Sequence, residues 1–404
     1  MRTHKRSAER VRNQKGTKDI YAMRKRKKRK KVLYQSIWLL LLSMTVLILY
    51  QRRDSWIPKL ETMGIRHHTN RLGTGSENDG AFQIYLYGDA DYQAAEAAGR
   101  LMVLSDSYLF VYDTDGTQLA ARQHAYGSAM LRTAGEYALV YEYGGTSFRL
   151  DTAAKNRYEK KTEDTIIFGR VSADGQVALV TSASNCACRL LVFNAKGQKY
   201  YERDCVERIV DVSFHAQGGG CYAISTDASE GSLHSVLYSY SFSQKENLWT
   251  SDPLDMLAIS VYNTEDGSVF VLGDTQCCWF SAEGALTGSF VYPDSLSRSD
   301  FSSGTAALVF SNPEKRSETL AVFSGSQAEP VYRTYDRSIQ DIAIRQDTGD
   351  VIVLLRNQTE ILNRGGTLLG TAPVTESCDS FLRAGGYLFL LGYDRIGRME
   401  EPGF

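Results

Sequence analysis

The feature that most constrains this 404-residue chain is a glycine turn followed by an apolar strand, which occurs eight times. Examples are TAGEYALV, ADGQVALV, EDGSVFVL and DTGDVIVL. The spacing between successive turn glycines runs from 36 to 48 residues and averages about 41. A period of about 40–45 residues with several strands per repeat is typical of a β-propeller blade, so the sequence predicts an all-β propeller. The eight glycines are Gly99, Gly135, Gly175, Gly219, Gly267, Gly304, Gly349 and Gly385.

Each repeat has room for four strands. The segments TIIFGRVS, RIVDVSFH and QDIAIRQD precede a turn glycine and are predicted to be innermost strands. After the glycine strand comes another strand that a tight turn closes, as in LLVFNAKG and CCWFSAEG, and then one more, as in QKYYERD. Glycine in such a hairpin turn can take the positive φ that other residues avoid.

The two ends of the repeat region predict how the ring closes. The last repeat, from about Thr375, lacks its outer strand, while the segment AFQIYLYG, residues 81–88, belongs to no repeat. A first strand that completes the last blade protects sheet edges. We therefore predict eight blades over residues 81–404, with seven blades or tandem β-sandwiches as alternatives. The only helix-like segment is DYQAAEAAGR, residues 91–100.

The N-terminal segment consists of a basic part followed directly by an uncharged, apolar part. Residues 1–31 hold 15 Lys and Arg against two acids, and the next nineteen residues, VLYQSIWLLLLSMTVLILY, hold no charge. Nineteen residues of helix reach roughly 28 Å, close to the hydrocarbon thickness of a bilayer. Val32–Tyr50 is therefore predicted to be a transmembrane signal-anchor helix that contacts the lipid bilayer. The alternatives are a buried core helix and a cleaved signal peptide, but no Ala-x-Ala cleavage pattern follows.

The charges around this span predict its orientation. The cluster Arg24–Lys31 outweighs Arg52 and Arg53, and Lys and Arg favour the cytoplasmic side. We expect residues 1–31 to be a cytoplasmic tail that contacts anionic lipid headgroups rather than nucleic acid. Residues 51–80 are predicted to be a flexible linker. The chain beyond the tail holds 31 Lys and Arg against 45 Asp and Glu, so an acidic propeller is expected outside the cell membrane.

The repeats VSADGQVALV and VYDTDGTQLA resemble those of bacterial envelope propellers of the TolB-like and quinoprotein-like kinds. The plan of a basic tail, one span and an extracytoplasmic propeller is similar to single-pass propeller families of unknown function in Gram-positive bacteria. The resemblance covers about Ala81 to Arg398 and lies in structural glycines and strand patterns. It implies a fold and a location at the cell envelope, and it implies no active-site residues.

Motifs of known chemistry are absent from the sequence. It has no Gly-x-Ser-x-Gly nucleophile elbow, no His-Glu-x-x-His and no Gly-x-x-x-x-Gly-Lys. No catalytic residue, metal ligand or cofactor is therefore predicted. Charged residues do fall in predicted innermost strands, namely Arg170, Asp211 and Asp341, with Asp300 a further candidate. Because innermost strands line the central channel of a propeller, these residues are predicted to form a polar binding mouth. A hydrated channel wall is the alternative.

The cysteines are odd in number and irregularly spaced, and Cys186-Ala-Cys188 is not a Cys-x-x-Cys pair. An extracytoplasmic location permits disulfides, and the repeat makes Cys186 or Cys188 a neighbour of Cys205 or Cys221. A bridge among these four is one interpretation. Small apolar fillers in strands are the other. The seven cysteines are Cys186, Cys188, Cys205, Cys221, Cys277, Cys278 and Cys378.

Two classes of function fit the sequence. The first is a membrane-anchored binding or scaffold module at the cell envelope, because a propeller presents loops on a rigid scaffold. Its acidic body favours a basic or neutral partner, either a protein or a glycan. The second is an envelope-acting lyase or hydrolase with a site in the channel mouth, which would need carboxylates about 5–10 Å apart for glycoside hydrolysis. We prefer the binding module, since no catalytic motif occurs.

Overall fold

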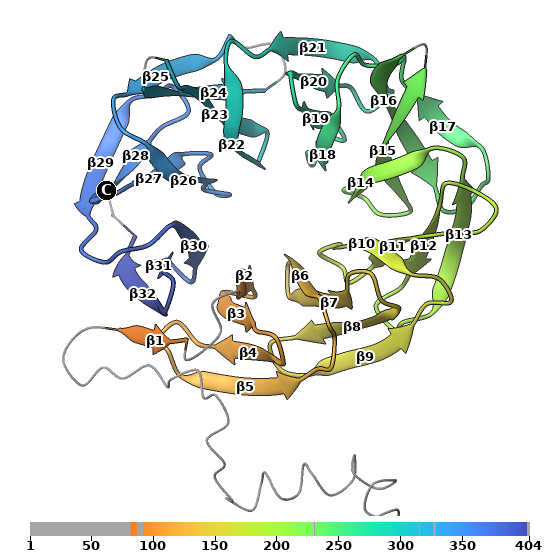
Figure 1. Ribbon diagram of the computed structural model, residues 1–404, viewed down its shortest axis with the longest axis horizontal. Coiled ribbons are helices and arrows are strands. Elements are labelled where there is room, and N and C mark those ends of the chain that lie inside the picture. The colour runs from red at the N-terminus through yellow and green to blue at the C-terminus, as the bar shows by residue number, and fades with distance from the viewer. Residues whose placement is uncertain (1–81, 87–91, 230, 315, 326–328, 402–404) are drawn as a thin grey trace, which may run out of the picture. The chain divides into compact units, whose positions relative to one another are not determined.

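The computed structural model describes residues 82–86, 92–229, 231–314, 316–325 and 329–401. In this part of the chain, 32 strands form eight four-stranded antiparallel sheets, arranged as the blades of a ring (Figure 1). In each of the first seven sheets, chain order runs outward from the axis of the ring, and each strand pairs with the next. The predicted eight-bladed β-propeller is therefore confirmed.

The first four blades follow the chain without interruption. Blade 1 contains β2 (Gln93–Ala97), β3 (Arg100–Leu104), β4 (Tyr108–Tyr112) and β5 (Gln118–Gln123). Blade 2 contains β6 (Ala129–Ala134), β7 (Tyr137–Glu142), β8 (Ser147–Thr152) and β9 (Asn156–Lys161). Blade 3 contains β10 (Ile166–Val171), β11 (Val177–Thr181), β12 (Cys188–Phe193) and β13 (Lys199–Cys205). Blade 4 contains β14 (Arg208–Phe214), β15 (Gly220–Ser229), β16 (Ser232–Ser241) and β17 (Asn247–Thr250).

The last four blades complete the ring. Blade 5 contains β18 (Ala258–Asn263), β19 (Val269–Gly273), β20 (Gln276–Phe280) and β21 (Leu286–Val291). Blade 6 contains β22 (Ser295–Ser302), β23 (Thr305–Asn312), β24 (Ser317–Ser324) and β25 (Val331–Tyr335). Blade 7 contains β26 (Ile339–Ile344), β27 (Val351–Leu355), β28 (Gln358–Leu362) and β29 (Leu368–Pro373). Blade 8 contains β30 (Ser380–Ala384), β31 (Tyr387–Leu391), β32 (Arg395–Glu400) and β1 (Gln83–Tyr85).

The strand β1 closes the ring, as the sequence predicted. It pairs antiparallel with β32, where Ile84 lies opposite Ile396. Both side chains are fully buried. They belong to one apolar cluster with residues of blade 1, including Leu101 and Val103. The first described strand and the last blade are thus joined by hydrogen bonds and by a shared core.

All eight repeated turn glycines have positive φ, between +56° and +84°. Alanine would be strained at such a position, which explains why the turn recurs with glycine. At Gly175 a side chain would also collide, since an added Cβ would lie 2.7 Å from the ring of Tyr137 in the preceding blade. The glycine repeat is therefore both a conformational requirement and, at Gly175, a packing requirement.

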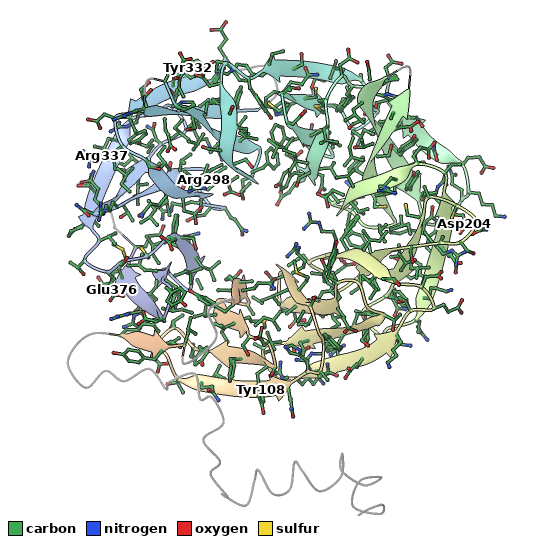
Figure 2. The ribbon with its side chains drawn as sticks, viewed as in Figure 1. Tyr108, Asp204, Arg298, Tyr332, Arg337 and Glu376 are labelled. Atoms are coloured by element: carbon green, nitrogen blue, oxygen red, sulfur yellow. The ribbon has the colours of Figure 1, made fainter. Side chains whose placement is uncertain are left out.

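The strands in the middle of each blade are buried on both faces. Every residue of β11, β19 and β27 is buried, because neighbouring blades cover both sides of each sheet. This explains their continuous apolar sequences. The outermost strands β5, β21 and β29 instead alternate between exposed and half-buried residues. Figure 2 shows side chains filling the space between neighbouring sheets.

The helix-like interpretation of DYQAAEAAGR is wrong, because Gln93–Ala97 form the innermost strand β2. Local preference for helix is weak and yields to tertiary context. Beside the axis β2 contacts the innermost strands β6 and β30 of both neighbouring blades. The space between blades is narrow beside the axis, and the alanines of β2 are small enough to fit there. The packing of the ring therefore explains why β2 is rich in alanine.

Several predictions fall on residues that the structure does not describe. The basic tail (1–31), the predicted transmembrane helix Val32–Tyr50 and the predicted linker (51–80) all lie outside the described residues. Within the described residues, no helix is long and apolar enough to span a membrane. The tail, span and linker therefore stay predictions.

Candidate functional site

A pocket of about 600 Å³ opens on one side of the ring. This is the side that carries the turns between the innermost and the second strand of each blade. It is lined by β10, β14 and β18, the innermost strands of blades 3, 4 and 5, and by the turns that follow β10 and β14. Its volume lies within the range of small-molecule sites. Its polar and aromatic wall includes Arg170, Asp211, Ser213, His215, Tyr262 and Asn263.

Arg170 and Asp211 meet in the wall of this pocket. Nε of Arg170 donates a hydrogen bond to Oδ1 of Asp211 at 2.7 Å, across the boundary between blades 3 and 4. The Asp211 side chain is almost fully buried, whereas 34% of the Arg170 side chain is exposed. Burial would lower the pKa of Arg170, but the Asp211 carboxylate raises it overall, so the guanidinium stays charged. Nη1 and Nη2 of Arg170 bond to no described residue and are available to a ligand.

Asp211 also links the backbones of two blades. Its Oδ1 accepts a hydrogen bond from the Val212 N–H at 2.8 Å, within its own strand. Its Oδ2 accepts one from the Val261 N–H at 3.1 Å, on β18 of the next blade. One buried carboxylate therefore satisfies two backbone donors that would otherwise be unpaired at the blade boundary.

The same link recurs at Asp300 and Asp341. Asp300 accepts from its neighbour Phe301 N–H at 2.9 Å and from the Ile344 N–H of the next blade at 2.7 Å. Asp341 accepts from the Ile342 N–H at 2.9 Å and from the Phe381 N–H of the next blade at 3.2 Å. In all three cases one oxygen binds the following residue and the other binds the next innermost strand. We call Asp211, Asp300 and Asp341 the clasp carboxylates.

The structure brings together two of the three residues predicted to form the binding mouth. Arg170 and Asp211 line the pocket and form an ion pair. Asp341 lies on β26 of blade 7 and is not part of the pocket wall. Its two oxygens are engaged by backbone donors. The role of these residues in binding a ligand stays a prediction.

The stability of the propeller is expected to fall as pH rises through the folded-state pKa of Asp341. Burial raises the pKa of Asp341, although two backbone N–H groups and Arg298 oppose the shift. The folded protein therefore binds this proton more tightly than the unfolded chain does. The resulting stabilisation is complete below the ordinary pKa and is lost as pH rises through the raised pKa. Asp341→Asn should remove this part of the dependence of melting temperature on pH, and identical profiles would contradict the assignment.

Four of the polar or aromatic wall residues named above were not singled out from the sequence, namely Ser213, His215, Tyr262 and Asn263. The Ser213 hydroxyl donates to Oδ1 of Asn263 at 2.7 Å, which joins blades 4 and 5 at the pocket. The Tyr262 ring packs on Phe301 of blade 6, with ring centroids 5.4 Å apart. Sequence position could have identified two of them. Ser213 and Tyr262, like Arg170, lie five or six residues before the turn glycine of their blade.

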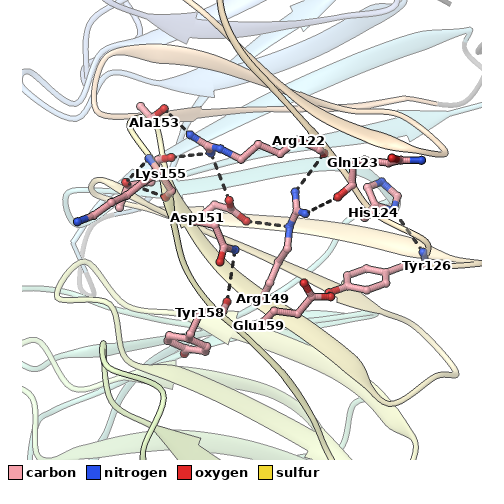
Figure 3. Close-up of polar contacts among 12 residues, drawn as sticks. Arg122, Gln123, His124, Tyr126, Arg149, Asp151, Ala153, Lys155, Tyr158 and Glu159 are labelled. Carbon is pink, nitrogen blue, oxygen red and sulfur yellow. Dashed lines mark hydrogen bonds and ion pairs between the residues drawn. The ribbon is translucent and has the colours of Figure 1, made fainter. Parts of the chain in front are cut away.

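A second charged cluster joins blades 1 and 2 (Figure 3). Asp151 on β8 is fully buried and accepts from Nη1 of Arg122 at 3.2 Å. Nε of Arg149 lies 2.9 Å from its other oxygen. Arg122 further donates to the carbonyls of Thr152 and Ala153, both at 2.8 Å. Asp151 and Arg149 are buried and Arg122 is half-buried, so we assign the cluster to blade packing rather than to binding.

Exposed apolar side chains occur in connections on the side of the ring opposite the pocket. This side carries the turns that join the second strand of each blade to the third, and the connections that lead from one blade to the next. Val206 is 82% exposed, Tyr393 75% and Tyr143 58%. None of the exposed large apolar side chains among the described residues lies in the turns of the pocket side. We call the following set the apolar loop face: Tyr143, Val206, Leu257 and Tyr393 in connections, with Leu233 and Ile259 near the ends of β16 and β18 on the same side.

Carboxylates accompany this face. Asp252 and Asp255 are exposed in the connection that leads to Leu257, and Glu207 follows Val206. Within the described residues, no cluster of three or more His, Cys, Asp or Glu side chains could hold a metal ion. Around Leu257 the apolar loop face therefore combines exposed hydrocarbon with negative charge.

The closed ring of eight four-stranded sheets, with a pocket on one side and the apolar loop face on the other, defines an eight-bladed β-propeller. The model of a family of unknown function, DUF5711, matches residues 86–381, and the chain belongs to this family. The predicted membership of a propeller family of unknown function is confirmed, whereas its bacterial origin and membrane anchor stay predictions. No curated protein sequence matches the chain significantly.

Three solved structures share the fold at low sequence identity. BamB from Moraxella catarrhalis has a TM-score of 0.53 and 14% identity, over 80% of this chain and 97% of the BamB chain. Sqt1 from Saccharomyces cerevisiae has a TM-score of 0.58 and 11% identity, over 79% and 98%. Sqt1 from Chaetomium thermophilum, bound to the N-terminus of the ribosomal protein L10, has a TM-score of 0.52 and 13% identity, over 78% and 98%. At these identities the likeness shows the fold alone.

Proposed function

We propose that this protein is a membrane-anchored binding module whose propeller holds a protein partner at the outer face of the cell membrane. The uncharged segment Val32–Tyr50 and the basic residues before it support the anchor and its orientation. The basic tail would bind anionic lipid headgroups, at about 1 kcal/mol for each nearby Lys or Arg. The observation that carries the binding role is the apolar loop face.

The apolar loop face has the composition of a protein-binding surface. Aromatic side chains such as Tyr143 and Tyr393 are enriched among the residues that dominate binding energy. Exposed hydrocarbon on connections of a rigid ring gains free energy when a partner covers it, by about 25 cal/mol for each Å². The flanking carboxylates of Asp252 and Asp255 favour a partner segment that carries Lys or Arg beside its apolar residues.

A solved relative in fold provides a precedent. The Chaetomium thermophilum Sqt1 structure holds the N-terminus of the ribosomal protein L10, so this fold can present a surface to a peptide segment. We propose a protein segment, rather than a glycan, as the partner of this chain, because the apolar loop face offers hydrocarbon and isolated carboxylates.

The pocket supports binding more than catalysis. Asp211 accepts from Arg170 and two backbone N–H groups. Asp174, at the pocket rim, accepts from the Ser172 hydroxyl and the Gln176 amide. Both carboxylates are thus engaged, whereas a lyase or hydrolase would need a carboxyl group that is available to the substrate. We propose that the pocket binds a polar ligand group through Arg170.

Photo-crosslinking in living cells tests the binding role. A photo-reactive amino acid at Val206 of the full-length protein should crosslink to one protein partner, and the same group at Leu286 should not. Leu286 is a matched control, because it is 55% exposed but lies on the outermost strand β21. The purified partner should bind the Val206→Asp variant at least about tenfold more weakly, a loss of about 1.4 kcal/mol. Equal crosslinking at both positions would overturn the proposal.

Protease treatment of intact cells tests the location independently. With tags at both ends of the full chain, the C-terminal tag should be removed by external protease after the wall is opened, while the N-terminal tag stays protected. Protection of the C-terminal tag until the membrane is lysed would reject the extracytoplasmic orientation. The crosslinking result does not depend on this outcome.

A further inference from the structure

Two cysteines of blade 3 lie directly opposite each other. Cys188 begins β12, Cys205 ends β13, and the two are partners in the antiparallel ladder. Such partners have Cα atoms about 4.5–5.5 Å apart. A disulfide spans about 4.4–6.8 Å between Cα atoms. From this juxtaposition we infer that Cys188 and Cys205 form a disulfide bond, which makes the pair a covalent modification site within the blade.

The structure selects this pair from the alternatives that the sequence left open. All seven cysteines lie in the described residues, and Cys188 and Cys205 are the only two that face each other in a ladder there. Cys221 shares their buried cluster, but its ladder partners are Phe214 and Tyr240. The Cys186 thiol donates to the Cys188 carbonyl at 3.2 Å and stands outside the strands.

The surroundings of the two sulfurs assign their roles. Hydrogen bonding from the Cys205 thiol is the main cause that lowers the pKa of Cys188, and the Ile209 N–H and the charge of Arg208 act in the same direction. The Ile209 nitrogen lies 3.5 Å from the Cys188 sulfur. The same hydrogen bond, together with burial, raises the pKa of Cys205. Cys188, whose pKa is lowered and whose sulfur lies beside a backbone N–H, is therefore assigned as the attacking thiol.

Oxidation proceeds by thiol–disulfide exchange with a small disulfide, such as oxidised glutathione. The Cys188 thiolate attacks one sulfur of that disulfide, forms a mixed disulfide and releases one thiolate, which takes up the Cys188 proton. Cys205 then loses its proton and attacks the Cys188 sulfur, which releases the second thiolate to take up that proton. Two protein thiols are oxidised to one disulfide, and one small disulfide is reduced to two thiols.

Burial makes this reaction depend on local opening. Cys188 has no exposed surface and Cys205 only 2%. The strand β13 is the outermost of blade 3, so it pairs with β12 alone and can separate from the blade more easily than inner strands can. Oxidation should therefore be slow in the native protein. Once formed, the bond would hold this edge strand on the blade.

Mass spectrometry of the purified full-length protein in detergent tests the inference. After equilibration with oxidised glutathione, the wild-type protein should lose two hydrogens in mass. Proteolysis without reductant should yield one linked product that joins the Cys188 and Cys205 peptides. Oxidised wild-type protein should also melt a few degrees higher than the reduced protein, and the Cys205→Ser variant should show no such difference.

A matched control separates this pair from general thiol oxidation. Cys277 is buried on β20, and Phe290 is its partner on the neighbouring strand β21, so Cys277→Ser should leave the linked product unchanged. Two free, alkylatable thiols at positions 188 and 205 after full equilibration would overturn the inference, and so would a linkage from Cys205 to Cys186 or Cys221. The test is made in a defined redox buffer, so its result is independent of the proposed location and partner.

Discussion

Replacing Ile84 by aspartate is expected to abolish the cooperative unfolding transition of the propeller or to lower its stability by more than about 4 kcal/mol. Ile84 is fully buried in the cluster that joins blade 8 to blade 1. The variant loses this apolar contact and puts a charge where no partner faces it. The strand β1 pairs only with β32, so the same change weakens the closure of the whole ring. Chemical denaturation followed by circular dichroism measures the effect.

The neighbouring residue supplies the control. Tyr85 lies on the same three-residue strand but is 37% exposed, so Tyr85→Asp should cost less than about 1 kcal/mol. The comparison separates loss of the buried contact from a general effect of negative charge on β1. Equal destabilisation by the two variants would contradict the closure, and so would wild-type stability in the Ile84 variant.

The features predicted correctly from sequence are those that each blade specifies locally. Positive φ at turns such as Gly175 and Gly267 requires glycine, so the turn is visible as a repeat. Burial of the middle strands on both faces produces continuous apolar runs, which mark the strands themselves. The closure of the ring by β1 was also predicted correctly, because the sequence shows an unmatched first strand and a last blade that lacks one strand.

The role of the clasp carboxylates could not be predicted from the sequence, because it depends on contacts between blades. The presence of Asp211, Asp300 and Asp341 in innermost strands was visible, but the sequence does not show that each carboxylate spans to the next blade. That arrangement depends on strand register, which shifts within β14, β22 and β26 shortly before the clasp carboxylates. The interpretation of all three as channel-facing residues missed this role.

The two faces of the ring were hidden from sequence for a related reason. Tyr143, Val206 and Tyr393 each stand alone in a short polar connection, so no local pattern marks them as one surface. They share a side of the ring only because the up-and-down order of strands brings alternate connections to that side. The disulfide pair is similar, since only the β12–β13 register distinguishes Cys188 from Cys186.

Asp211→Ala is expected to destabilise the propeller by about 3 kcal/mol, a large fraction of the 5–15 kcal/mol that is typical of a folded domain. The change removes the acceptor of the Val212 and Val261 N–H groups, which lie in a buried boundary between blades. It also removes the counter-charge of Arg170. An unpaired buried donor costs about 1–3 kcal/mol, so two such donors account for most of the loss. Equilibrium denaturation of both proteins at neutral pH measures the difference.

Asp174→Ala is the matched control, because Asp174 borders the same pocket but is exposed and binds only side chains of its own turn. It should change stability by less than about 0.5 kcal/mol. If the two alanine variants are equally stable, the clasp carboxylates do not hold the blades together. A large loss for Asp211→Ala alone would mean that the Asp211 carboxylate is fixed by the fold. In that case Arg170, whose terminal nitrogens bond to no described residue, is the member of the ion pair that can still bind a ligand.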